Sequence, residues 1–309
     1  MNSPIQGIYT ASLTPLTSSF EPNINELINH ALWLLESGSD GVALLGSTGE
    51  ANSLTIEQRL KIISNCGRKL PPDRIIFGTG SCALKDTINL TKASLDVGVN
   101  SVLIIPPFYY KPQSDESVFR YFSELISIIN DSKLRIIFYN FPKLSGYNFS
   151  IKILKKFRSQ FGEIALGVKE SSGEMDTFLN IVKNIPDFMI FPGTESFLLE
   201  NLRLGGTGCI SATANLTSQE CQKVNLAWKN GQNDKAELLQ KNLSNLRKVL
   251  EKHSFVSGLK SIFANKKNTE VWKYMLPPFS LLKSEEVNLL ESQIKDIGLD
   301  LDLLVGKNS

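Results

Sequence analysis

The sequence predicts a (β/α)8 barrel that is followed by a C-terminal helical extension. Its 309 residues fit one large barrel with additional helices. Eight short runs are continuously apolar, as expected for parallel strands buried on both faces, and longer amphipathic stretches separate them. After the eighth run the alternation stops and only helical periodicity remains. We therefore predict a barrel over residues 1–215 and an extension over residues 216–309, packed on the barrel because no Gly/Ser-rich linker separates them.

The eight apolar runs are the predicted strands. They cover Gly7–Leu13, Gly41–Leu45, Arg74–Gly78, Ser101–Ile105, Leu134–Tyr139, Ala165–Lys169, Phe188–Gly193 and Gly208–Ser211. The number matters, because eight βα units indicate a closed barrel whereas six would indicate an open, doubly wound sheet.

The stretches between the strands carry helical signals. Asn25–Glu36 places Leu27, Ile28 and Ala31 on one face, and Thr55 is a good N-cap for the helix Thr55–Cys66. The other predicted barrel helices are Asp86–Val97, Ser114–Ile129, Ser150–Phe157, Glu174–Asn184 and Glu195–Arg203. In the extension we predict one long helical region, Thr217–His253, then Phe255–Ala264 and Lys283–Asp296, interrupted at Pro277-Pro278.

Composition excludes several classes of protein. The net charge is +2 without a sustained basic block, so we expect no nucleic-acid partner. The N-terminus lacks a signal pattern and no apolar run approaches 18 residues, so we expect a cytoplasmic protein without membrane association. The four cysteines form no C-x-x-C pair and are predicted to be free thiols. His30 and His253 do not follow strands, which argues against a Ser-His-Asp triad or a histidine-rich metal site.

The residues directly after each run are the candidates for chemistry, because the active sites of barrels lie at the C-terminal ends of the strands. The second run ends in Gly46-Ser47-Thr48-Gly49-Glu50. Backbone N–H groups in such a turn can bind an anion, and the two hydroxyls add donors. The alternative is an ordinary polar βα turn.

Lys169 closes the sixth run, which is otherwise apolar. Burial of an unpaired ammonium is unfavourable, whereas a neutral lysine amine is a nucleophile that can attack a carbonyl. The alternative is a lysine that extends from the strand end to solvent. Tyr139 ends the fifth run, where a phenol could donate and accept protons or could simply bond to backbone.

Three further strand ends are less specific. The fourth is followed by Pro106-Pro107-Phe108-Tyr109-Tyr110-Lys111-Pro112, a stiff aromatic loop that suits packing at the rim or a subunit contact. After the seventh run, Gly193 and Glu195 could contact a polar substrate, although Glu195 would also favour a helix N-terminus. Ile210, in the eighth run, is predicted to lie near the site.

Together these segments resemble the dihydrodipicolinate synthase / N-acetylneuraminate lyase family of class I pyruvate-dependent aldolases. The resemblance rests on GSTGE at 46–50, PPFYYKP at 106–112, YNFP at 139–142, GVKES at 167–171 and the stretch at 205–215, in matching order over roughly residues 5–300. It implies that Lys169 forms a Schiff base with pyruvate and that Tyr139 and Thr48 relay protons. It also implies that Ser47 and Thr48 bind the pyruvate carboxylate and that the enzyme needs no metal or other cofactor. Tyr109 matches a rim tyrosine that crosses between subunits in the synthases, so a homotetramer, a dimer of dimers, is expected.

Two departures from the family bear on the substrate. The synthases bind a carboxylate through an arginine two residues after the proline of YN-x-P, where this chain has Leu144. Sialate lyases carry an acidic pair after the seventh strand, and here the matching residues are Glu195 and Ser196. We therefore expect a lyase or aldolase that acts on a 2-oxo acid and an aldehyde, with a 2-keto-3-deoxy sugar acid or an N-acetylneuraminate-like acid as substrate. The alternatives are 4-hydroxy-tetrahydrodipicolinate synthase and a non-catalytic regulatory barrel that binds oxo acids.

Overall fold

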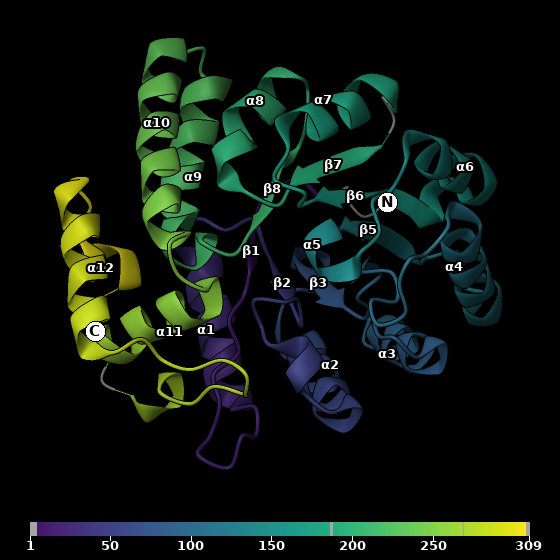
Figure 1. The fold of residues 1–309 in the computed structure, drawn as a ribbon, viewed down its shortest axis with the longest axis horizontal. Helices are drawn as coiled ribbons and strands as arrows, with labels where there is room; N and C mark the ends of the chain where they lie inside the picture. Colours follow the sequence, from purple (N-terminus) through teal and green to yellow (C-terminus); the bar gives the residue numbers. More distant parts are fainter. Residues whose placement is uncertain (1–4, 186–187, 268, 307–309) are drawn as a thin grey trace.

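The computed structural model describes residues 5–185, 188–267 and 269–306, so the outer limits of the predicted domains, residues 1 and 309, lie outside the described residues. Eight parallel strands form one sheet in the order β7-β6-β5-β4-β3-β2-β1-β8, which is a nearly closed (β/α)8 barrel (Figure 1). The strands are β1 (Gly7–Ala11), β2 (Gly41–Leu44), β3 (Ile75–Gly78), β4 (Ser101–Ile104), β5 (Arg135–Asn140), β6 (Ala165–Glu170), β7 (Met189–Pro192) and β8 (Gly208–Ser211). The predicted fold and all eight predicted strands are confirmed, with ends that differ by one or two residues.

Helices follow the strands as predicted. They are α1 (Ile24–Glu36), α2 (Ile56–Lys69), α3 (Leu84–Asp96), α4 (Asp115–Ile129), the short α5 (Pro142–Ser145), α6 (Ile151–Phe161), α7 (Met175–Asn184), α8 (Leu198–Arg203) and α9 (Ala214–Lys229). The predicted N-cap is confirmed, because the Thr55 hydroxyl accepts from the Gln58 N–H at 3.2 Å and the Gln58 side chain accepts from the Thr55 N–H at 3.0 Å. A single turn of 3-10 helix, Glu195–Phe197, precedes α8, so the predicted helix Glu195–Arg203 has two parts.

The extension comprises α10 (Asn233–Leu250), α11 (Phe255–Lys266), α12 (Ser284–Asp296) and α13 (Leu301–Val305). The one long helical region predicted over Thr217–His253 is helical but consists of two helices, because the chain turns at Gly231, where φ is +70°, and α9 and α10 run side by side. Helix α9 packs on β1 and β8 as the eighth barrel helix, so the predicted boundary at residue 215 falls inside it.

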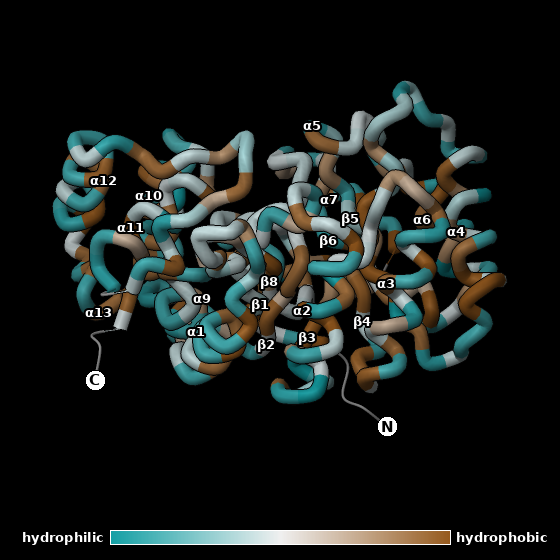
Figure 2. The backbone as a smooth tube through the Cα atoms, turned by 90° about the horizontal axis from the view of Figure 1, so that it is seen from below, coloured by the Kyte–Doolittle hydropathy of each residue, from teal (hydrophilic) through white to brown (hydrophobic). Residues whose placement is uncertain are grey.

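The extension lies beside α1 and the β8 side of the barrel, away from α3, α4 and α6 (Figures 1 and 2). Its own core contains Leu246, Leu259, Phe263 and Trp272. None of the helices in the described ranges is long and apolar enough to cross a membrane.

The barrel interior is filled by side chains from alternate strand positions. Tyr9, Ala43, Ile137, Phe191 and Ile210 belong to this inner cluster. Their strand neighbours point outward into separate clusters beneath the helices, for example Ile136 and Ile190. This alternation decides which residues at the strand ends can face a ligand in the barrel mouth.

Candidate active site

Lys169 and Tyr139 lie side by side at the mouth of the barrel. They are register partners on β6 and β5, and Phe191 of β7 flanks Lys169 on the other side. Tyr139 and Phe191 belong to the inner cluster, so Lys169, at the same level, also faces inward. Two of the residues to which the sequence assigned chemistry are thus brought together.

The Lys169 side chain is buried beside the Tyr139 ring. The residue is 5% exposed, and Nζ lies 4.5 Å from the centroid of the Tyr139 ring. Within the described ranges, no carboxylate lies within 4 Å of this nitrogen. The alternative of a lysine extended into solvent is therefore wrong.

The turn after β2 closes the opposite wall of the mouth. It starts at Leu45 and ends at Glu50, both with positive φ, and the Gly49 N–H donates to the Gly46 carbonyl at 3.1 Å. A small cavity between this turn and Tyr139 is lined by Gly46, Ser47, Gly80 and Ile105. Thr48 is buried beside it at 8% exposure. Among the described residues, the N–H groups of Ser47 and Thr48 donate to no protein acceptor, so they are available to an anion.

Glu50 anchors this turn to the extension. Its carboxylate forms an ion pair with Lys260 of α11 and accepts from the Leu276 N–H at 2.7 Å. Both side chains of the pair are fully buried, and Lys260 also donates to the Tyr274 carbonyl at 3.0 Å. Burial lowers the pKa of Lys260, while Glu50 opposes that shift. Sequence reasoning missed Lys260, although a lysine inside the apolar stretch Phe255–Ala264 was a signal.

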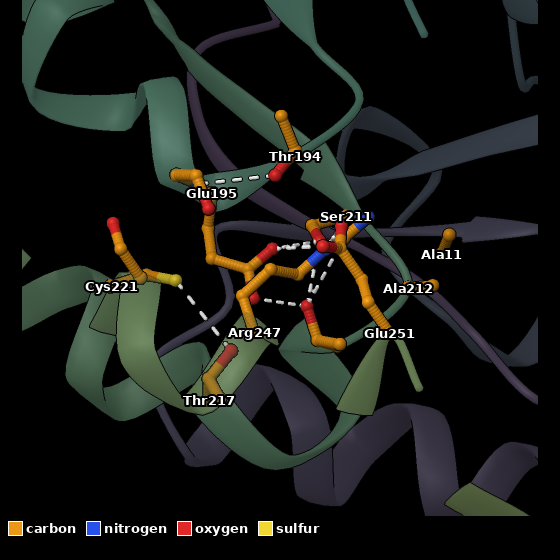
Figure 3. A network of polar contacts seen from close by, with 12 residues as sticks. Ala11, Thr194, Glu195, Ser211, Ala212, Thr217, Cys221, Arg247 and Glu251 are labelled. Atoms are coloured by element: carbon orange, nitrogen blue, oxygen red, sulfur yellow. Dashed lines mark hydrogen bonds and ion pairs between the residues drawn. The ribbon is translucent and has the colours of Figure 1, made fainter. Parts of the chain in front are cut away.

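Glu195 does not face the mouth. It follows β7 directly and is fully buried on the outer side of the barrel wall, where its carboxylate accepts from Ser211, Thr213 and Arg247 (Figure 3). In this conformation Glu195 offers no surface to a substrate, because all of these partners belong to the protein. The alternative reading of Glu195, that it favours the start of a helix, agrees with the 3-10 turn that begins there.

Ile210 and Gly193, the two other predicted substrate contacts, have no polar side chain that could bind a substrate. Ile210 is fully buried in the barrel interior. The Gly193 N–H donates to the Glu170 carbonyl at 2.6 Å, and a Cβ on Gly193 would lie 1.9 Å from the Ser171 hydroxyl oxygen. Glycine is therefore required for β7 to approach β6 so closely.

A second polar pair, which sequence reasoning missed, lies behind Lys169 and Tyr139. Asn140 and Glu170 immediately follow Tyr139 and Lys169, so strand alternation turns them outward. The Asn140 amide donates to Glu170 at 2.5 Å, and the other carboxylate oxygen of Glu170 accepts from the Ser172 N–H at 2.5 Å. This pair fixes the ends of β5 and β6 relative to each other.

The aromatic loop extends from the rim. Tyr109 and Tyr110 are 75% and 83% exposed, with ring centroids 5.1 Å apart. The Lys111 ammonium crosses to α5 and donates to the Leu144 carbonyl at 3.1 Å. Leu144, at the position of the synthases' arginine, is 42% exposed. Within one chain, Tyr109 is thus a surface residue.

A wider groove lies in the extension, away from the mouth. It runs between α11, α12 and α13, and its charged lining residues Lys266, Glu291 and Asp302 form ion pairs through Lys266. Reactive groups of the kind found at the mouth do not converge there in the part of the chain that the structure describes.

Comparison with known proteins decides the family. The model of the dihydrodipicolinate synthetase family matches residues 4–297. The chain belongs to the dihydrodipicolinate synthetase family. A 4-hydroxy-tetrahydrodipicolinate synthase from Methanopyrus kandleri is 31% identical over 257 residues, which cover 81% of this chain and 83% of that protein. An uncharacterized DapA-like lyase from Chloroflexus aurantiacus is 28% identical over 299 residues, or 94% and 97% of the two chains.

Solved structures of the family agree with the fold. YagE, a prophage protein of the dihydrodipicolinic acid synthase family from E. coli solved in complex with pyruvate, superposes with a TM-score of 0.87. It is 25% identical, and the match covers 96% of this chain and all of that one. As a member of this family of carbon–carbon lyases and synthases, the chain is an enzyme.

Proposed function

We propose that the enzyme forms a Schiff base between Lys169 and pyruvate and makes or breaks a carbon–carbon bond next to it. The observation that carries this proposal is the inward-facing pair of Lys169 and Tyr139, where no carboxylate of the described residues lies within 4 Å of the amine. An adjacent carboxylate would favour the ammonium, which has no lone pair with which to attack a carbonyl.

The proposed steps balance without an external oxidant or metal. Lys169 Nζ attacks C2 of pyruvate, and the carbinolamine loses water to give an iminium ion. The iminium accepts the electron pair released when C3 loses a proton. In the cleavage direction the iminium is that of the larger 2-oxo acid, and the electron pair comes from the bond between C3 and the hydroxyl-bearing C4, whose hydroxyl loses its proton as C4 becomes the aldehyde carbon. The resulting enamine attacks the aldehyde in the synthetic direction. We propose that Tyr139 carries these protons with Thr48, and that the free amides of Ser47 and Thr48 bind the pyruvate carboxylate.

For the second substrate we propose an aldehyde without a carboxylate near its reactive end, as in cleavage of a 2-keto-3-deoxy sugar acid. Leu144 cannot form the bidentate pair that an arginine offers to a carboxylate. Arg247 forms an ion pair with Glu195, so in this conformation the Glu195 carboxylate cannot bind the hydroxyl groups of a sialate. The second candidate is 4-hydroxy-tetrahydrodipicolinate synthase, which the names of several relatives favour.

Borohydride trapping tests the imine. The protein is incubated with pyruvate and borohydride, and its intact mass is compared with those of Lys169→Ala and Lys111→Ala, the latter an exposed lysine at the same mouth. We expect one adduct, equal to pyruvate minus one oxygen atom, on the wild type and on Lys111→Ala but not on Lys169→Ala. A folded wild type that binds pyruvate without an adduct would instead support the non-catalytic barrel.

A screen of aldehydes with pyruvate then separates the two enzymatic candidates. Faster turnover of uncharged hydroxyaldehydes than of aspartate semialdehyde supports our proposal. The reverse order would assign the enzyme to the synthases despite Leu144.

We also propose that the enzyme is a homotetramer in which another subunit covers Tyr109 and Tyr110. Two aromatic rings this exposed at the rim favour a contact with another chain. Sedimentation velocity is expected to show tetramers for the wild type and smaller species for Tyr109→Ala/Tyr110→Ala. A monomeric wild type would remove any role of Tyr109 across subunits.

A further inference from the structure

The barrel has a seam between β7 and β8. Within the described residues, the backbone ladder runs from β7 through β6 to β1 and β8, and no pairing joins β7 to β8, although the two strands lie next to each other. Side chains span the seam instead. At its lower end, the buried Asn201 amide donates to the Ile190 carbonyl of β7 at 3.2 Å and to the Gly208 carbonyl of β8 at 2.8 Å.

The upper end of the seam is closed by a buried charged network (Figure 3). Glu195 from the end of β7 accepts from the hydroxyls of Ser211 and Thr213 at the end of β8. Arg247 of α10 inserts one nitrogen, Nη1, which lies 3.1 Å from Glu195 Oε2 and 3.1 Å from each hydroxyl oxygen. One guanidinium thus holds both strand ends.

Four more contacts of α10 side chains fix Arg247 and the chain after β7. Arg247 Nε donates to Glu251 at 2.7 Å, and the guanidinium lies 4.2 Å from the centroid of the Phe255 ring. Gln240 donates to the Glu195 carbonyl and accepts from the Leu199 N–H, both at 3.0 Å. The network is therefore oriented before any substrate binds.

The seam is one strand away from Lys169. Strand β7 lies between them, with Phe191 beside Lys169 and the Gly193 N–H on the Glu170 carbonyl. If the upper seam opens, β7 is free to move at the level of the reactive amine. A misplacement of about 1 Å at a reacting group can cost on the order of 100-fold in rate.

We infer that Arg247 and Glu195 are positioning residues, which close the β7/β8 seam and thereby hold Lys169 in place for imine formation. This inference rests on the proposed function for its kinetic consequence. Its structural consequence, an opened seam, does not depend on it.

Arg247→Met is the test variant, because it leaves the Glu195 carboxylate buried without its cation. We expect amide hydrogen exchange in β7 and β8 to speed up, and the rate of borohydride-trapped imine formation at saturating pyruvate to fall about 10- to 100-fold. The half-saturating pyruvate concentration should change less than about threefold, since the turn at Ser47 follows β2, across the mouth from β7. Arg247→Lys should recover part of the rate, because its ammonium can reach only some of the three acceptors.

Two variants keep the test decisive. Arg203→Met removes an exposed ion pair to Glu237 that also joins α8 to α10, and it should leave exchange and imine formation unchanged. Glu195→Gln/Arg247→Met replaces the ion pair by neutral groups, so it should fold even if Arg247→Met does not, and the seam should still exchange faster than in the wild type.

The outcomes separate the two proposals. If the wild type forms no adduct, the proposed function fails, and exchange in β7 and β8 alone decides the seam. If the wild type forms the adduct, and both Arg247→Met and the double variant match it in exchange and rate, the inference is wrong and the proposed function stands. A loss of stability with an unchanged imine rate would reduce Arg247 to a purely structural role and would also overturn the inference.

Discussion

Removal of the Lys260 charge should destabilise the protein and weaken pyruvate binding together. In Lys260→Met the Glu50 carboxylate stays buried and keeps only the Leu276 N–H, while the Tyr274 carbonyl loses its donor. Loss of one partner from a buried ion pair costs about 3–5 kcal/mol. Because one hydrogen bond to Glu50 remains, we expect the lower end, about 3 kcal/mol, which corresponds to a fall in Tm of roughly 6–12 °C.

The effect on binding follows from the position of Glu50 in the turn that carries Ser47 and Thr48. With the anchor gone, the free amides of the turn lose their fixed orientation. We expect the half-saturating pyruvate concentration for trapped imine to rise about tenfold, which is about 1.4 kcal/mol of binding. The maximal imine rate should change less, because Lys169 is held by other strands. Lys260→Met should therefore change mainly the half-saturating pyruvate concentration, whereas Arg247→Met should change mainly the rate of imine formation.

Lys266→Met is the matched control for Lys260→Met, and Glu50→Gln is a second variant of the same ion pair. Lys266→Met, on the same helix but with partly exposed ion pairs, should cost under about 1 kcal/mol. Glu50→Gln leaves Lys260 without its counter-charge, which lowers the pKa of Lys260 further. The unfolded chain then binds more protons than the folded one at pH values up to the ordinary lysine pKa of about 10.4, so the deficit of this variant relative to wild type should shrink as pH rises toward that value. A Lys260→Met protein with the Tm and pyruvate dependence of wild type would refute the anchoring role.

Three other predictions concern single residues. Tyr139→Phe should leave the circular dichroism spectrum unchanged and slow imine formation about 100-fold or more, and a rate within threefold of wild type would exclude Tyr139 as the proton carrier. His30 is buried and its pKa is lowered to about 3, mainly by desolvation, so the unfolded chain binds more protons between pH 3 and 6.5. Urea unfolding should show about 2 kcal/mol less stability at pH 5 than at pH 7 relative to His30→Gln, and parallel profiles would contradict this. Leu144→Arg should raise the turnover of aspartate semialdehyde relative to that of an uncharged aldehyde at least tenfold. An unchanged ratio would show that this position does not contact the second substrate.

The fold was predictable because strand burial leaves a strong sequence signal. Eight apolar runs with helical stretches between them are a periodic pattern that local reading detects. The break at Gly231 was missed even though Asn230-Gly231 is a turn signal, because the apolar residues on both sides continue a helical period. Strand alternation likewise explains why the inward direction of Tyr139 and Lys169 could be anticipated.

The direction of Glu195 could not be obtained in this way. The chain leaves β7 at Pro192 and enters a 3-10 turn at Glu195, so the period of two no longer applies there. Its partner Arg247 is 52 residues away, and Lys260 is more than 200 residues from Glu50. Such pairs depend on how the extension packs, which a local pattern does not contain.

The outward direction of the carboxylates also bears on the nucleophilic role that we propose for Lys169. Glu50, Glu170 and Glu195 follow or end strands around the mouth, and each is turned away from the interior and bonded to protein donors. Any one of them beside Lys169 would form an ion pair and favour the charged, unreactive amine. Two of the three are neutralised by cations from the extension, Lys260 and Arg247. The extension therefore does more than cover apolar surface. It supplies the positive charges that pair with acidic residues at the rim, while no carboxylate of the described residues lies within 4 Å of the Lys169 nitrogen.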